Sequence, residues 1–214
     1  MLGLTGSPSR QPLRGVASFF GARFAALHSR FVIYPACTVL ALMVSYALGK
    51  EMAWDTLNHH LYAGFSAIHD RFAQDYFAAG PQGYLNPYAY VPFYALVAIG
   101  LPALAVASVL AAFQSVMLWL TYELGLIVSP TGTPWRRAAF ALCGVALASL
   151  NSILLQQLGT SFTDITTGEL VLGGWCLLAA AVRAPSALRV TVAALLLGVA
   201  TAFKLTNAVH ARHA

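Results

Sequence analysis

The sequence predicts an all-α, polytopic integral membrane protein, and three observations lead to this fold class. Hydrophobic residues make up 59% of the 214 residues and charged residues only 9%, against about 25% charged residues in a typical soluble domain. The apolar residues are gathered in long runs, and a membrane-spanning helix needs about 20 such residues. Most of the few acidic and basic residues fall in the segments between these runs.

Five apolar runs are expected to cross the membrane, and together they form a transmembrane helical domain over residues 31–207. The runs extend over about residues 31–49, 102–128, 138–155, 170–182 and 190–206. Gly100 and Pro102 mark a break before the second run, and a short interfacial helix is expected over residues 90–99. Residues 1–30, rich in Ser, Pro, Gly and Arg, predict a mostly disordered cytoplasmic tail.

The charges orient these helices, because Lys and Arg beside short loops are retained on the cytoplasmic side. Eight arginines lie before the first run or in the loops that follow the second and fourth runs. They are Arg10, Arg14, Arg23, Arg30, Arg136, Arg137, Arg183 and Arg189. Six of the seven acidic residues fall on the opposite side, in segments 50–101 and 156–169. This pattern predicts a cytoplasmic N-terminus, an outer loop over residues 50–101, and no nucleic-acid partner, since no basic aromatic patch is present.

The outer loop begins with an amphipathic segment, W-D-T-L-N-H-H-L-Y-A-G-F-S-A-I-H-D-R-F, over residues 54–72. Its apolar stripe at helical spacing consists of Leu57, Leu61, Phe65, Ile68 and Phe72. This predicts a helix lying in the membrane surface, with its polar side toward water or a cavity. Asp55 and His59 are four residues apart and share one face of that helix, whereas His60 points elsewhere.

Asp55 fits two roles that the residues alone leave open. At the start of a helix an Asp is a good N-cap, which contributes about 1 kcal/mol. A carboxylate at this position is also suited to act as a general base. Asp55 and His59 could bind a divalent metal ion, but two ligands are too few to define a metal site, so no definite cofactor is predicted.

Four segments carry a family resemblance: W-D-T-L-N-H-H-L-Y after the first run, G-P-Q-G-Y-L-N-P-Y-A-Y-V-P-F-Y in the outer loop, and later T-S-F-T-D and F-K-L-T-N. Together they resemble the N-terminal part of bacterial polytopic glycosyltransferases of the GT-C superfamily, near glycosyltransferase family 87. The resemblance covers most of residues 31–207. It implies a hexosyltransferase of the bacterial cytoplasmic (inner) membrane. Such an enzyme moves a sugar from a polyprenyl-phosphate donor, a membrane lipid, to an acceptor on the outer face.

The resemblance also implies site residues. Asp55, directly after the first run, is the matching position for the base that accepts a proton from the acceptor hydroxyl. Residues expected to bind substrate are Asn58, His59, His60, Asp164 and Lys204. Lys204 is either a lysine that snorkels to the membrane surface or a ligand of the lipid phosphate. Asp164 is either an N-cap or a second acid of the site.

Two further patterns have a structural and a functional interpretation. Thr166 and Glu169 fit a capping box that would begin the fourth run. Aromatic residues near the end of the outer loop form either an interfacial belt or a platform for a sugar. They are Tyr84, Tyr88, Tyr90, Phe93 and Tyr94.

An alternative function from another class is a small membrane transporter or a non-catalytic membrane subunit. Transport sites lie near the midplane on broken helices, whereas most acids here lie in the loops; only Asn151, Gln156 and Gln157 favour the alternative. Because members of the resembled superfamily have more than five spans, residues 208–214 are expected to be a C-terminal tail of a truncated form. The sequence does not identify any protein partner.

Overall fold

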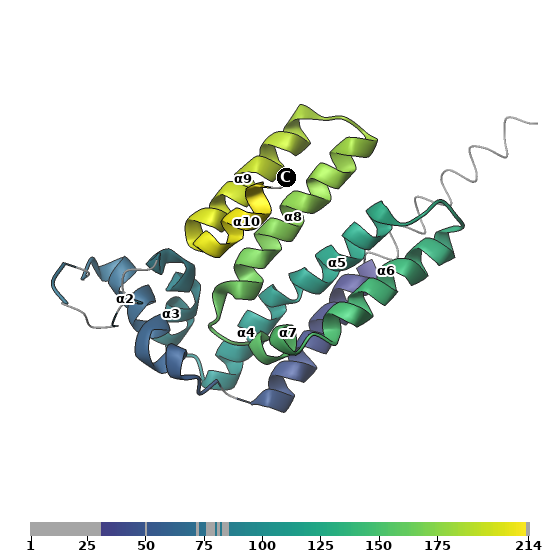
Figure 1. Cartoon of the computed structure of the whole chain (residues 1–214). Helices are drawn as coiled ribbons and strands as arrows, with labels where there is room; N and C mark the ends of the chain where they lie inside the picture. Colours follow the sequence, from purple (N-terminus) through teal and green to yellow (C-terminus); the bar gives the residue numbers. More distant parts are fainter. Residues whose placement is uncertain are drawn as a thin grey trace, which may run out of the picture.

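The computed structural model describes residues 31–49, 51–71, 73–75, 80, 82 and 86–212. Every regular element in these ranges is a helix and none is a strand, so the predicted all-α fold is confirmed for this part of the chain (Figure 1). The predicted tail over residues 1–30 lies outside the described residues, as do Phe72 of the apolar stripe and Tyr84 of the aromatic group.

Three helices are long and apolar enough to cross a membrane, and they match the first, second and fourth predicted runs. They are Phe31–Leu48, Ala103–Val128 and Asp164–Arg183. The second consists of α4 (Ala103–Gln114) and α5 (Val116–Val128), which meet at Ser115. The third is most of α8 (Thr163–Arg183). The membrane-protein class is therefore supported by three helices.

The other two predicted runs form shorter helices. α6 (Pro134–Ser149) ends earlier than predicted, because Asn151 accepts hydrogen bonds from the backbone of Ile153 and Leu154 and so starts the separate helix α7 (Ser152–Gln157). α9 (Ala187–Phe203) has 17 residues. At 1.5 Å per residue, helices of this size reach about 25 Å, somewhat less than the ~30 Å of a bilayer core.

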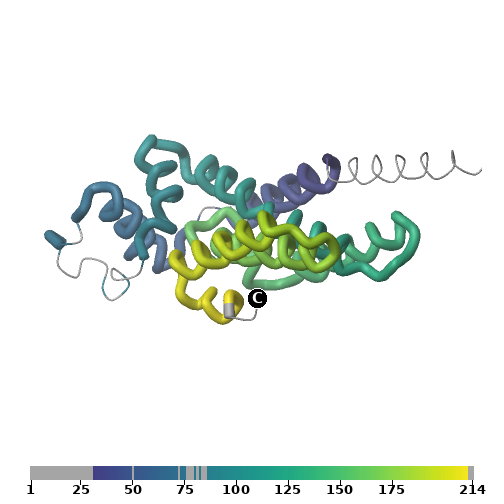
Figure 2. Tube along the Cα trace, turned by 90° about the horizontal axis from the view of Figure 1, so that it is seen from above, coloured from purple at the N-terminus to yellow at the C-terminus, as the bar shows by residue number. Residues whose placement is uncertain are grey.

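The long helices lie side by side, with α8 between α9 and α5, and α6 along the other side of α5 (Figure 1). The helix Phe31–Leu48 packs on this group through Cys37, which shares a buried cluster with residues of α5 and α6. A second cluster joins the same helix to α4 and α8. After α9 the chain forms η4 (Leu205–Asn207) and α10 (Ala208–Arg212), and α10 folds back against α9 (Figure 2).

The first loop, residues 50–101, contributes a group of short helices at one end of the long helices (Figure 1). The π-helical turn η1 (Thr56–His60) continues into α2 (Leu61–His69). The 3-10 turn η3 (Pro87–Tyr90) continues into α3 (Val91–Ala98), and α2 packs against both. These elements hold the residues of the candidate site.

The amphipathic segment is helical, and part of its apolar stripe is exposed, whereas Phe65 is half-buried against Tyr94. Leu57 is 64% exposed and Ile68 is 53% exposed, whereas His59 and His60 are buried. The polar side of the helix was expected to face water or a cavity. Instead, it carries the two histidines into the protein interior.

Candidate functional site

The π-helical turn η1 directs two consecutive histidines inward. His59 is 5% exposed and His60 is 2% exposed, and their ring centroids are 4.4 Å apart. Nδ1 of His59 lies 3.6 Å from the Asp55 carboxylate, whereas Nδ1 of His60 lies 2.6 Å from Oγ of Ser161, so the two rings touch but have different polar neighbours. Both histidines belong to a π-turn, which closes with i→i+5 hydrogen bonds. Such turns are rare and frequently occur at functional sites.

Asp55 lies beside His59 and is not an N-cap. Its backbone is helical, with φ −61° and ψ −42°, and its side chain makes no capping hydrogen bond. The helix already includes Trp54, so the N-cap interpretation is wrong. One carboxylate oxygen, Oδ1, is 3.6 Å from Nδ1 of His59, and the Asp55 side chain is 39% exposed.

Nδ1 of His59 is buried without a hydrogen-bond partner among the described residues. Burial lowers the pKa of His59, and the Asp55 carboxylate partly offsets this shift. The carboxylate of Asp55 is the accessible part of this pair, and the His59 nitrogen beside it is a buried polar atom without a hydrogen bond.

His60 belongs to a hydrogen-bonded network that joins the first loop to the start of α8. Its Nδ1 is 2.6 Å from Oγ of Ser161. Glu51 accepts hydrogen bonds from the Ser161 hydroxyl at 3.0 Å and from the Ser161 backbone N–H at 2.7 Å, and it also accepts one from Thr56. These bonds are satisfied when His60 carries its proton on Nδ1 and donates it to Ser161, which donates to Glu51.

Tyr90 covers the two histidines. Its ring stacks on His60 with centroids 4.5 Å apart at 21°, and it meets the edge of His59. Burial raises the pKa of Tyr90, a hydrogen bond with Thr163 opposes that shift, and the negative charges of Asp164 and Asp55 add to it. Tyr90 thus lies close enough to Asp55 of the first loop and to Asp164 of α8 for both charges to affect its pKa.

Asp164 and Lys204 form an ion pair across the ends of α8 and α9. Their side chains are 44% and 31% exposed, so the pair remains accessible. Gln157 also donates to Asp164, at 3.3 Å. The N-cap of α8 is Phe162, so the N-cap alternative for Asp164 is wrong. Lys204 follows the last residue of α9.

Five of the six predicted site residues are therefore brought into one neighbourhood. The pKa of His60 responds to His59, Lys204 and Asp164, and that of Tyr90 responds to Asp55 and Asp164. Asn58 does not join them: its side chain is exposed and donates to the carbonyl of Trp54 in its own helix. No group of three or more His, Cys, Asp or Glu side chains that could hold a metal ion occurs among the described residues.

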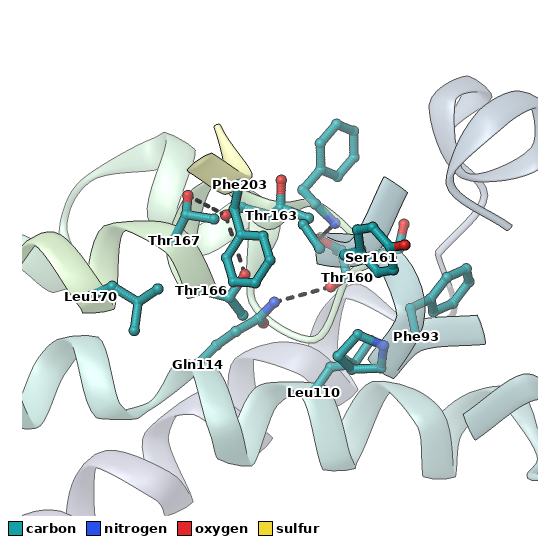
Figure 3. A pocket seen from close by; sticks show the side chains of 14 residues that line it. Phe93, Leu110, Gln114, Thr160, Ser161, Thr163, Thr166, Thr167, Leu170 and Phe203 are labelled. Atoms are coloured by element: carbon teal, nitrogen blue, oxygen red, sulfur yellow. Dashed lines mark hydrogen bonds between the residues drawn. The ribbon is translucent and has the colours of Figure 1, made fainter. Parts of the chain in front are cut away.

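A pocket of about 160 Å³ lies next to this neighbourhood, between α4, α8, η3 and the end of α9 (Figure 3). Ser161 and Thr163 line it, and so do Tyr88, Phe93 and Phe203. Of the predicted aromatic group, Tyr88 and Phe93 therefore face a cavity, whereas Tyr90 packs on His60. The lining is mainly aromatic and hydroxyl-bearing.

Glu51, Ser161 and Gln114 are site residues that the sequence analysis missed. Gln114, 1% exposed, reaches from α4 to the turn before α8, where it donates to the Thr160 carbonyl and accepts from the Gly159 N–H (Figure 3). A glutamine inside an apolar run was a signal that could have identified it. Ser161 had no such signal.

The capping box expected at Thr166 and Glu169 is also wrong. α8 begins at Thr163, so Glu169 lies inside the helix. Its carboxylate accepts a hydrogen bond from the backbone N–H of Met117, at the start of α5. Glu169 thus supports the junction of α4 and α5.

Comparisons with protein-family models, with curated proteins and with solved structures give no match for this chain. The resemblance to GT-C glycosyltransferases therefore stays a prediction.

The burial of His60 predicts a loss of stability in acid. Burial, assisted by His59 and Lys204, lowers the pKa of His60 from its ordinary 6.5 to about 3. The unfolded chain thus takes up a proton near pH 6.5 that the folded chain does not bind until about pH 3. The stabilisation is fully present above pH 6.5 and is lost as the pH falls, by at most about 1.4 kcal/mol per pH unit.

We expect the unfolding temperature of the chain in detergent to fall between pH 6.5 and pH 4. His60→Asn keeps a hydrogen-bonding group near Nδ1 but cannot take up the proton, so this variant should show a weaker dependence on pH. Identical pH profiles for the variant and the wild type would contradict the role of His60.

Proposed function

We propose that this protein is a membrane-embedded glycosyltransferase that moves a sugar from a polyprenyl-phosphate donor to an acceptor hydroxyl on the outer face of a bacterial cytoplasmic membrane. In this proposal α6 and α9 also cross the membrane, the N-terminus is cytoplasmic, and the first loop lies outside. The donor class comes from the GT-C resemblance. The site is the neighbourhood of Asp55, His59, Asp164 and Lys204.

The observation that carries the proposal is the meeting of an accessible carboxylate and an accessible cation at the same end of the long helices. Asp55 follows the first long helix, and Lys204 follows α9, about 150 residues later in the chain. Within the described structure no hydrogen bond holds the Asp55 side chain, and Nδ1 of His59, 3.6 Å from it, has no hydrogen-bond partner. A buried structural acid would be satisfied instead.

The chemistry follows from these positions. The Asp55 carboxylate accepts the proton of the acceptor hydroxyl as its oxygen attacks the anomeric carbon of the sugar. The bond between that carbon and the phosphate oxygen breaks, and the lipid phosphate leaves with the electron pair. Lys204, held by Asp164, offers an ammonium to the negative charge that develops on the phosphate.

Replacing Lys204 tests this arrangement. With the full chain in proteoliposomes and a polyprenyl-phosphate hexose as donor, Lys204→Gln should raise the KM for the donor about tenfold, which corresponds to about 1.4 kcal/mol. Arg71→Gln, which removes another cation of the first loop, is the control and should leave the KM unchanged. An unchanged KM in Lys204→Gln would remove the lysine from the site, and no transfer by the wild type would reject the proposed function.

A transporter remains the second candidate because of one observation, the break between α4 and α5. At this break Ser115 bonds with Thr38 at 3.0 Å, and Glu169 accepts from Met117. Transport sites are often built on broken helices that face polar groups inside the membrane. Substrate uptake that is lost in Glu169→Gln but kept in Asp55→Asn would favour this function over sugar transfer.

A further inference from the structure

A second pocket, of about 280 Å³, lies on the other side of the Glu51 network. Glu51 and Thr56 form its polar end. Apolar residues of η1, α2, α3 and α4 form the rest of its wall. Leu57, Leu61 and Val97 in this wall are 64%, 38% and 37% exposed, so the pocket is an open groove on the surface of the protein.

In the proposed topology the groove runs from the membrane surface toward the membrane interior, as a membrane lipid does. Glu51 comes three residues after Leu48, the end of the first long helix, so in the proposed topology it is placed where headgroups meet water. From there the wall continues along α4 from Ala103 to Leu110, about 10 Å down a helix that is long enough to span the membrane. A polar end at the surface and an apolar wall below it match a headgroup and the upper part of an acyl chain.

The negative charge of Glu51 determines which kind of lipid headgroup can bind in the groove. All three of its hydrogen-bond partners are donors: the Thr56 hydroxyl, the Ser161 hydroxyl and the Ser161 N–H. This set suits an ionised carboxylate, which can only accept. Among the described residues no Lys, Arg or His pairs with it. A negative charge at the end of an apolar groove attracts a cation and repels a phosphate that has no ammonium beside it.

We propose that this groove binds a membrane lipid with an ammonium headgroup, with the ammonium on Glu51 and the upper acyl chain along α4. The volume is near the lower end of the about 300–1,000 Å³ typical of ligand pockets, so the groove holds one part of the lipid and leaves the rest in the bilayer. The groove lies beside the proposed sugar-transfer site and meets it at the Glu51–Ser161 hydrogen bonds, but it binds a cationic headgroup, whereas the sugar donor carries an anionic phosphate.

Lipid selectivity tests the inference without any measurement of sugar transfer. The full chain is placed in nanodiscs of equal parts phosphatidylethanolamine and phosphatidylglycerol, transferred to detergent, and the lipids that stay bound are counted by native mass spectrometry. The wild type should retain phosphatidylethanolamine over phosphatidylglycerol about fivefold, as expected for one charged contact at a partly exposed site.

Three variants test whether Glu51 and the apolar wall of the groove cause this selectivity. Glu51→Gln removes the charge and should bring the ratio of the two lipids close to one. Ala103→Phe keeps Glu51 but fills the apolar wall, so it should lower the retention of phosphatidylethanolamine; this variant decides the question if Glu51→Gln does not fold. Asp75→Asn removes a carboxylate that Arg71 already pairs and should behave as the wild type. Equal retention of both lipids by the wild type, or an unchanged ratio in either groove variant, would overturn the inference.

Discussion

Asp55→Asn should lower sugar transfer by about two to four orders of magnitude, the usual loss when a general base is removed, while the protein still inserts and folds. The structure gives a reason for intact folding: the Asp55 side chain caps no helix and makes no hydrogen bond within the described structure. Replacing the carboxylate by an amide of the same shape therefore removes no hydrogen bond on which the fold depends. The measurement is kcat for transfer from a polyprenyl-phosphate hexose by the full chain in proteoliposomes.

Asp70→Asn is the matched control, because it is the same change fifteen residues further along the same helical segment. Asp70 is exposed and ends α2 with a left-handed backbone, φ 48°, a conformation that Asn adopts well. This variant should transfer sugar at the wild-type rate. A wild-type rate in Asp55→Asn as well would remove the proposed base and leave the site without its central residue.

Gly159→Ala should be the most destabilising single-methyl change in the turn before α8. Gly159 has φ +79°, and an added Cβ would overlap Oγ of Ser45 and lie 3.0 Å from the Ala107 carbonyl oxygen. The left-handed backbone costs about 1–3 kcal/mol for other residues, and overpacking of a tight site costs a similar amount. We expect a loss of about 3 kcal/mol, measured as the free energy of unfolding in detergent.

Gly198→Ala provides the comparison. Gly198 lies in α9, and an added Cβ there meets nothing within 4 Å, so the change should leave stability the same or slightly higher. Similar stabilities of the Gly159→Ala and Gly198→Ala proteins would show that the turn yields easily. In that case the turn would fix the position of Ser161 less firmly than its contacts indicate.

The helices that the sequence predicts best are those formed by uninterrupted apolar runs. Phe31–Leu48 and Ala103–Val128 match their predicted ranges within one residue at each end, because apolar length alone decides them. The start of α8 was missed by seven residues, since the local capping pattern at Thr166 and Glu169 competes with tertiary contacts. Gln114 and Glu51 hold the preceding turn, and neither is near it in the sequence.

In the candidate site, too, some features are predictable from the sequence and others depend on tertiary contacts. Asp55, His59, Asp164 and Lys204 are predicted site residues because the segments that contain them resemble GT-C glycosyltransferases, and the structure places them near one another. Their pairing was not predictable, because only the packing of α8 on α9 brings Lys204 to Asp164. The inward direction of His60 depends on a π-turn, for which no reliable sequence pattern exists.

The bond between Glu51 and Ser161 has a consequence for how the protein is made. The two residues are separated by 110 positions, so Glu51 leaves the ribosome long before its partner exists. At synthesis rates of about 5–20 residues per second, the wait is on the order of 5–20 s. During that interval the start of α8 is not there to fix the position of η1, and His60 lacks the Ser161 hydroxyl that it contacts in the finished protein. The site can therefore close only after the start of α8 has been synthesised.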